Sequence, residues 1–336
     1  IFVAETGTIV SGGDPLVEAN HNQRGISVVG DNNLVNVKGA IGLLRQTPTF
    51  PLPPSSAGIL VTGDANEIVL HAAGTIPGSG HIEIASRSTP GVFVEGDGNR
   101  IDAQGTISTK GLTSSGLSIL GGSNDILLSG GIETLGSEAY GVLARGSGNT
   151  VILSGDVNTS GASALGVLAF GSDNTIILSG DITTTGDDAN GVHFWAGNSG
   201  NRLELHSGFS LAATGTGAAL AQGGGNSTLT LGGTDAGSFG ISDIGTADGY
   251  AGFSNFDKRG SSVWTLIGAN NAVDWTVQEG TLLVNGAAGD MEVLSGAALG
   301  GSGSVGDTVI NAGSRLIGVQ GQTLTLASLD LDAGSI

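Results

Sequence analysis

The stretch that decides the fold runs from residue 116 to 190 and consists of three consecutive 25-residue units: GLSILGGSNDILLSGGIETLGSEAY, GVLARGSGNTVILSGDVNTSGASAL and GVLAFGSDNTIILSGDITTTGDDAN. Each unit contains a Gly-x-x-Asn element. Outward from this stretch the element, slightly altered in one unit, recurs with spacings of 33, 33, 25, 25, 25, 27 and 25 residues. Its asparagines are Asn33, Asn66, Asn99, Asn124, Asn149, Asn174, Asn201 and Asn226. A period of this kind is typical of repeat architectures.

Within each unit, inward apolar positions alternate with other residues, and this period of two predicts β-strands. The position after the leading glycine is apolar throughout, as in Ile59, Val92 and Val142. Three such short strands per unit predict an all-β fold, a right-handed parallel β-helix in which each unit of about 25 residues is one rung. Rungs stack about 4.8 Å apart, so equivalent apolar residues form ladders along the axis. The asparagines are predicted to stack in the same way, in a structural role.

The repeat also divides the chain. Residues 1–240 are predicted to form the β-helix body, 241–262 an irregular connector, and 263–336 further β-helix rungs with a different pattern. The first two spacings exceed 25 residues by eight, which places loop insertions near 39–57 and 71–90. The first insertion is rich in proline, which indicates a rigid exposed loop. Both insertions are expected at one corner of adjacent rungs, where they would stack into a single protrusion.

Composition limits the partners. The 336 residues include 62 glycines, no cysteine, and 30 acidic against 11 basic residues, for a formal net charge of −19. This charge disfavours nucleic acid and anionic lipid as partners, and the lack of cysteine excludes thiolate metal sites and a disulfide framework. The chain opens with Ile1-Phe2-Val3-Ala4-Glu5 and has no uninterrupted apolar run of about eighteen residues. We therefore expect a soluble, processed or trimmed piece of an extracellular or cell-surface protein.

The C-terminal segment carries a recognisable pattern. It reads Trp264-Thr265-Leu266, then Gly280-Thr281-Leu282-Leu283-Val284-Asn285-Gly286, then GAALGGSGSV over 296–305. This closely resembles the passenger-associated repeat near the C-terminal end of autotransporter passenger domains in Gram-negative bacteria. That family usually continues with an L-A-P-G-like turn, whereas this chain has LIGVQGQTLTL over 316–326. The resemblance covers about 70 residues, and the upstream β-helix agrees with it in architecture.

The resemblance implies a function and a location. Autotransporter passengers are secreted or displayed at the bacterial cell surface or outer membrane, and their C-terminal region helps to nucleate folding. It implies membrane contact only through a translocator domain that is not in this sequence. Among passengers, the most fitting role is a non-enzymatic adhesin that mediates attachment to host cells or matrix, or bacterial aggregation. A carbohydrate-active β-helix enzyme, either a lyase or a glycosidase, is the alternative.

Candidate catalytic and metal-binding residues are few. A glycosidase needs paired carboxylates facing one groove, and a lyase needs a basic residue or a calcium site near an arginine. Asp156 and Asp181 occupy equivalent positions on adjacent rungs, where solvated turn aspartates are expected. Asp31, Asp64 and Asp97 stack about 5 Å apart, which favours either a calcium ion between them or purely structural turns. The sequence therefore predicts no catalytic residue, no metal site and no cofactor.

The two outward columns of the first strand are unusually apolar. An outer face in contact with solvent is expected to be mostly polar, so this stripe indicates a partner-binding surface or a surface covered by a loop. The predicted partner-binding residues are Leu60, Phe93, Leu120, Leu143, Leu168, Phe170 and Trp195. The alignment places Leu220 beside His193 and Gln222 beside Trp195. We expect the partner to be a host cell-surface or matrix protein or glycan, or another copy of this chain. The alternative is that the long inserts of the first two rungs cover the stripe.

Overall fold

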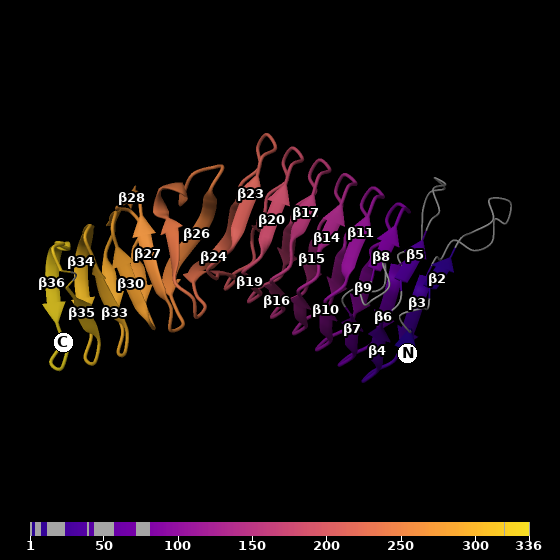
Figure 1. Ribbon diagram of the computed structural model, residues 1–336, viewed down its shortest axis with the longest axis horizontal. Coiled ribbons are helices and arrows are strands. Elements are labelled where there is room, and N and C mark those ends of the chain that lie inside the picture. The colour runs from indigo at the N-terminus through magenta and orange to yellow at the C-terminus, as the bar shows by residue number, and fades with distance from the viewer. Residues whose placement is uncertain are drawn as a thin grey trace.

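The chain forms a long stack of parallel strands. The computed structural model describes residues 2–3, 8–11, 24–38, 40–43, 57–71, 81–318 and 320–335. Figure 1 shows an elongated molecule whose rungs follow one another along the long axis, with the two ends of the chain at opposite ends of the stack. The fold prediction of a parallel β-helix is confirmed. No helix within the described ranges is long and apolar enough to cross a membrane.

Three ladders of strands, here called the first, second and third faces, run along the body of the β-helix. The first face contains β3 (Arg24–Val29), β6 (Ala57–Thr62), β9 (Val92–Glu95), β12 (Leu117–Leu120), β15 (Val142–Arg145), β18 (Val167–Phe170) and β21 (Val192–Phe194). The second face contains β1 (Phe2–Val3), β4 (Leu34–Val37), β7 (Glu67–Leu70), β10 (Arg100–Ala103), β13 (Asp125–Leu128), β16 (Thr150–Leu153), β19 (Thr175–Leu178) and β22 (Arg202–Leu205). The third face contains β2 (Thr8–Ser11), β5 (Ala40–Leu43), β8 (His81–Ile84), β11 (Thr106–Thr109), β14 (Ile132–Thr134), β17 (Val157–Thr159), β20 (Asp181–Thr184) and β23 (Ser210–Ala213).

The C-terminal rungs continue the stack with a shorter repeat. Two long strands, β24 (Ala221–Leu231) and β26 (Tyr250–Lys258), extend both the first and the second faces. They are followed by β28 (Ala269–Asn270), β29 (Trp275–Val277), β31 (Ala287–Ala288), β32 (Met291–Val293), β34 (Ser304–Ile310) and β36 (Thr325–Leu331). A separate ladder contains β25 (Gly237–Gly240), β27 (Val263–Ile267), β30 (Thr281–Val284), β33 (Ala298–Gly301) and β35 (Arg315–Ile317). One short 3-10 helix covers Ile241–Asp243.

The register follows the repeat. Leu117 pairs with Val142, Val142 with Val167 and Val167 with Val192, so the predicted inward column is confirmed for these rungs. The side chains in this column are buried, and they join the equivalent residues of the other faces in one continuous core. Stacking of branched apolar residues every 25 positions therefore supplies the interior of the stack.

The extra residues of the first two rungs fall at different positions between the described strands. In the first rung the extra residues, 44–56, come after the third-face strand β5, whereas in the second rung they are residues 72–80 and precede β8. The prediction of one shared corner is therefore wrong, because Ile82 pairs with Ile41 and Ile107 and completes the third-face column. The insertions themselves lie outside the described residues.

The region between the body and the C-terminal rungs is more regular than predicted. Within 241–262, strand β26 pairs with β24 on one side and with β29 on the other. The prediction of an irregular connector is therefore wrong for residues 250–258, which form part of the ladder. Strand β26 was missed because its Gly, Ser and Asn content hides the alternation of strand residues.

Candidate functional site

The structure brings the predicted partner-binding stripe together on the outer side of the first face. Leu60 pairs with Phe93, and Leu143 pairs with Leu168. In the next outward column Leu120 pairs with Arg145, and Arg145 with Phe170. Trp195 follows directly after β21 and donates its backbone N–H to the carbonyl of Ala169 at 2.9 Å. The predicted columns are therefore present as one strip along the axis.

Part of this stripe is a small core of its own. Leu60, Leu143 and Leu168 expose only 4%, 8% and 3% of their surface. Leu143 and Leu168 pack against Leu165, and Tyr140 lies against the same cluster. Leu165 and Tyr140 belong to the turns that precede β18 and β15.

The burial of these leucines changes their predicted role. Turns of the rungs themselves cover Leu143 and Leu168, so their side chains are packing residues in this conformation. The alternative cover, by the inserts 44–56 and 72–80, involves residues outside the described ranges. Leu60 is likewise removed from solvent and is not available to a partner.

The exposed part of the stripe consists of one aromatic and one aliphatic side chain, next to two half-buried phenylalanines. Trp195 exposes 49% of its surface and Leu120 exposes 43%, while Phe93 and Phe170 are half-buried. The Trp195 and Phe170 rings lie 4.8 Å apart between centroids, and the Arg145 guanidinium lies 5.5 Å from the Phe170 centroid. Arg145, Phe170 and Trp195 thus form a row along the axis that combines a tilted contact between two aromatic rings with a cation–π contact.

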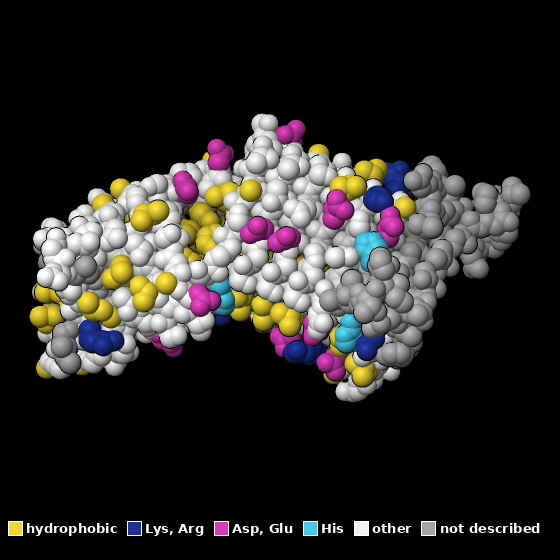
Figure 2. All heavy atoms as spheres, in the orientation of Figure 1, with side chains coloured by type: hydrophobic (Ala, Val, Ile, Leu, Met, Phe, Trp, Pro, Cys, Tyr) yellow, Lys and Arg dark blue, Asp and Glu magenta, His cyan; other side chains and the backbone are white. Residues whose placement is uncertain are grey.

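A shallow hollow of about 280 Å³ continues this row toward the N-terminus. It is lined by Pro90, Phe93, Ser118, Leu120, Leu143 and Arg145. Figure 2 shows one face of the molecule, on which acidic side chains are scattered and hydrophobic ones form patches. The row itself is flanked by charge, because Leu120 pairs with Glu95 on one side and with Arg145 on the other.

Three polar side chains, those of Asn190, His193 and Gln222, border the row at Trp195. Asn190 Oδ1 accepts the backbone N–H of Ala219 at 2.8 Å, and Asn190 Nδ2 donates to Gln222 Oε1 at 3.1 Å. The distance between Asn190 Nδ2 and His193 Nδ1 is 3.0 Å. Burial lowers the pKa of His193, so its ring is uncharged at neutral pH.

The register of this last rung differs from the sequence alignment. His193 pairs with Gln222, so Gln222 occupies the His193 column and Leu220 does not. The irregularity between Gln222 and Ser227, in a segment of three consecutive glycines, shifts the strand relative to the Gly-x-x-Asn element.

A groove on the outer side of β26, β29, β32 and β34 was missed by the sequence analysis. It has a volume of about 690 Å³ and contains one arginine, Arg259, among several carboxylates. The acidic residues that line it are Asp257, Asp274, Asp290, Glu292 and Asp307. They escaped notice because their spacing is set by the shorter C-terminal rungs rather than by the 25-residue repeat.

The carboxylates of this groove already have structural partners. Asp257 Oδ2 accepts hydrogen bonds from Arg259 Nε at 2.8 Å and Gln278 Nε2 at 2.9 Å. The backbone N–H of Asp290 donates to Asp274 Oδ1, also at 2.8 Å, and Asp307 repeats this contact with Asp290. The arrangement thus satisfies backbone donors at successive turns.

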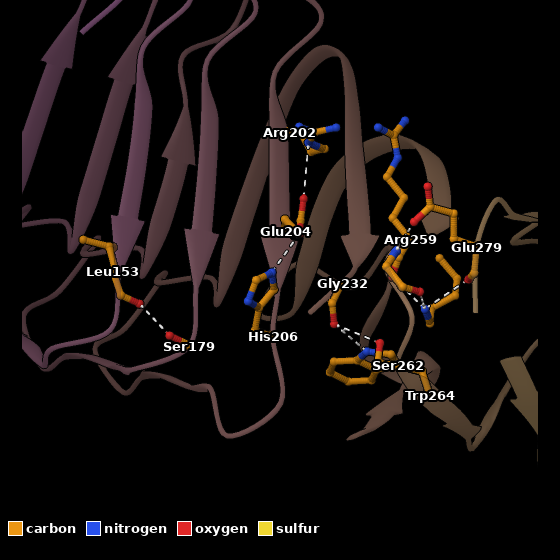
Figure 3. A network of polar contacts seen from close by, with 12 residues as sticks. Leu153, Ser179, Arg202, Glu204, His206, Gly232, Arg259, Ser262, Trp264 and Glu279 are labelled. Carbon is orange, nitrogen blue, oxygen red and sulfur yellow. Dashed lines mark hydrogen bonds and ion pairs between the residues drawn. The ribbon is translucent and has the colours of Figure 1, made fainter. Parts of the chain in front are cut away.

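A charged cluster lies on β22 and on the residue that follows it, as Figure 3 shows. His206 Nε2 and Glu204 Oε1 are 2.8 Å apart, and Arg202 Nε is 3.8 Å from the other carboxylate oxygen of Glu204. The hydrogen bond from His206 holds the pKa of Glu204 below its ordinary value, against the effect of burial. This keeps Glu204 ionised, which suits an ion-pair network rather than a general acid.

The remaining candidates have structural contacts or lie in solvent. Asp64 donates its backbone N–H to Asp31 Oδ1 at 2.9 Å, and Asp97 does the same to Asp64 at 2.8 Å. Asp156 and Asp181 are exposed. In the part of the chain that the structure describes, no group of three or more His, Cys, Asp or Glu residues is placed to hold a metal ion.

Comparison with known proteins identifies no family for this chain. No protein-family model matches this chain, and the searches of curated proteins and of solved structures found no match to it.

Proposed function

We propose that this chain is a non-enzymatic attachment module, secreted or displayed at the bacterial cell surface as an autotransporter passenger. In this role it acts as an adhesin toward host cells or matrix, or aggregates bacteria by self-association. The observation that supports the proposal is the row formed by Leu120, Arg145, Phe170 and Trp195, which leaves a tryptophan half-exposed on a rigid ladder. Exposed aromatic anchors on a preorganised surface are the residues that dominate most interfaces.

The fold suits this role because it holds side chains at fixed intervals over a long surface. Each rung contributes one or two outward residues about 4.8 Å from those of the next, so several contacts form without ordering a loop. The C-terminal pattern from Trp264 onward supports the autotransporter part of the proposal through the resemblance alone.

The test uses variants that remove exposed apolar groups without touching the buried leucines. Fluorescently labelled protein and bacteria displaying it are applied to cultured epithelial cells and to matrix-coated wells, and bacterial clumping is followed by turbidity. Leu120→Ser combined with Trp195→Ala should lower attachment or clumping about tenfold or more with little change in unfolding temperature. Leu135→Ser is the matched control, because Leu135 is 44% exposed but follows the third-face strand β14.

Two results would overturn this proposal. The first is wild-type protein that attaches to neither surface and causes no clumping. The second is a double variant that binds as well as the wild type, or a Leu135→Ser variant that loses as much binding as the double variant.

The acidic groove supports a second candidate, a carbohydrate-active enzyme. Asp274 and Asp290 would be its first candidate carboxylates, since both line the groove. A screen of neutral and acidic polysaccharides for cleavage tests this directly. Turnover that is abolished by Asp290→Asn but kept in Asp156→Asn would replace the attachment proposal, and the absence of turnover across the screen rejects the enzyme.

A further inference from the structure

Trp195 differs from the other two tryptophans of the chain. Trp264 and Trp275 are fully buried, whereas about half of Trp195 is exposed. Its ring is nevertheless fixed, because it packs on Phe170 at 4.8 Å and lies 6.0 Å from the His193 ring. The indole therefore presents a flat apolar face whose position is set before any partner arrives.

The hydrogen bonds of Asn190 determine which donors beside this ring are unused. A backbone N–H can only donate, so the atom of Asn190 that faces Ala219 is its oxygen. The nitrogen of Asn190 must then donate to Gln222 Oε1 and to His193 Nδ1. Consequently His193 carries its proton on Nε2, and the amide nitrogen of Gln222 keeps both of its protons free. Neither donor has a hydrogen-bond partner in the described part of the chain.

We propose that Trp195, His193 and Gln222 form a sugar-binding subsite, in which a pyranose ring of a glycan stacks on the indole of Trp195. The proposal rests on the attachment function above and names the class of its ligand. The apolar C–H face of a pyranose fits a flat aromatic ring, while its hydroxyl oxygens accept from His193 Nε2 and from Gln222 Nε2. Both donors are uncharged at neutral pH, which suits a neutral sugar.

The same groups argue against a purely apolar protein anchor. An aliphatic or aromatic side chain placed on Trp195 would cover the donors of His193 and Gln222 without pairing them, and each donor that is buried unpaired weakens binding. The row also continues through Phe170 to Arg145 in steps of about 4.8 Å. One sugar unit of an extended oligosaccharide has a comparable length, so a chain of sugars can follow the axis of the ladder.

The experiment measures binding of neutral oligosaccharides of glucose, galactose, mannose and N-acetylglucosamine by calorimetry and by tryptophan fluorescence. Trp195 should dominate the ligand response, since the other two tryptophans are buried. Trp195→Ala should lower the affinity for the bound sugar about tenfold or more, and Gln222→Ala should lower it severalfold. Leu135→Ser, at an exposed leucine that follows the third-face strand β14 and lies outside the row, should leave the affinity unchanged.

The outcomes separate this inference from the attachment proposal. If no sugar binds, or if Trp195→Ala binds as tightly as the wild type while keeping its unfolding temperature, the subsite is wrong. If Trp195→Ala loses attachment but free sugar neither binds nor competes, the partner is a protein, so attachment stands and the subsite fails. If sugar binds through Trp195 while attachment is insensitive to the row, the subsite stands and the attachment role fails.

Discussion

The backbone N–H of Asn149 donates a 2.9 Å hydrogen bond to the side-chain Oδ1 of Asn174, the equivalent residue of the next rung. The same contact links each asparagine to the next from Asn33 to Asn201. Apart from Asn33, these side chains are buried. The asparagine ladder therefore satisfies a backbone donor that the turn between the first and second faces removes from water.

Replacing one asparagine should cost more than removing a comparable side chain elsewhere. Asn149→Leu removes the acceptor of the Asn124 backbone N–H, which lies 3.0 Å from Asn149 Oδ1. We expect the free energy of unfolding to fall by about 1–3 kcal/mol, because a buried donor is left unpaired. Denaturant unfolding measures the change, with Asn158→Ala, an exposed position on β17, as the control. Equal losses in the two variants would contradict a structural role for the ladder.

A second prediction concerns the glycines of the same turn. Gly146 has φ of 139°, and a Cβ on it would lie 2.1 Å from the carbonyl oxygen of Gly121 in the preceding rung. Gly146→Ala should therefore lower the free energy of unfolding by about 3 kcal/mol or more, through backbone strain and a clash between rungs. Gly98→Ala is the matched control, because Gly98 also has positive φ, at 65°, but open space around it. Its cost should stay near 1–2 kcal/mol, and a comparable loss at both positions would rule out rung-to-rung contact as the cause.

A third prediction concerns the two parts of the outer stripe. Leu168→Ala should cost about 2–3 kcal/mol, because it leaves a cavity beside Leu143 and Leu165. Leu120→Ala removes a similar group from a position that is 43% exposed and should cost less than about 0.5 kcal/mol. Thermal and denaturant unfolding distinguish the two. Similar costs would show that the division into packing and exposed residues is wrong.

The sequence predicted the body of the fold because the same residue types recur at a fixed spacing. Strand alternation around Val142 and Val151 identified both the inward direction and the pairing partner. It did not identify Ile82, since the insertion before β8 displaces this residue from the expected position. Where the spacing stays constant, period and register can therefore be predicted together.

The candidate site was predictable only in part. Alternation shows that Leu168 points away from the interior, but it does not show that Leu165 and Tyr140 fold over this part of the stripe. Likewise, the donors beside Trp195 depend on the pairing of His193 with Gln222, which an irregular strand shifts. Burial by turns and register changes at glycine runs depend on tertiary structure, and the repeat pattern carries no signal for either.

Lys258 is a fully buried cation in the C-terminal rungs. Its Nζ donates to three backbone carbonyls, those of Arg259 at 2.6 Å, Gly260 at 2.7 Å and Glu279 at 3.1 Å. Burial lowers the pKa of Lys258 from 10.5 to about 8, although the carboxylates of Glu279 and Glu204 oppose this shift. Because the folded state releases this proton more readily than the unfolded chain, the stability of the fold depends on pH.

The last prediction gives the sign of that dependence. Between pH 8 and pH 10 the unfolded chain binds the Lys258 proton while the folded chain has begun to lose it, so the free energy of unfolding should rise with pH, by about 2 kcal/mol. Lys258→Met should lack this rise.

Lys110→Met is the control. The Glu83 carboxylate raises the pKa of Lys110, so the contribution of Lys110 to the free energy of unfolding is lost only above pH 10.5. Measurements should stop near pH 10, since burial raises the pKa of Tyr250 and unfolded tyrosines ionise above that value. A rise that persists in Lys258→Met, or is missing from the wild type, would contradict a depressed pKa at this lysine.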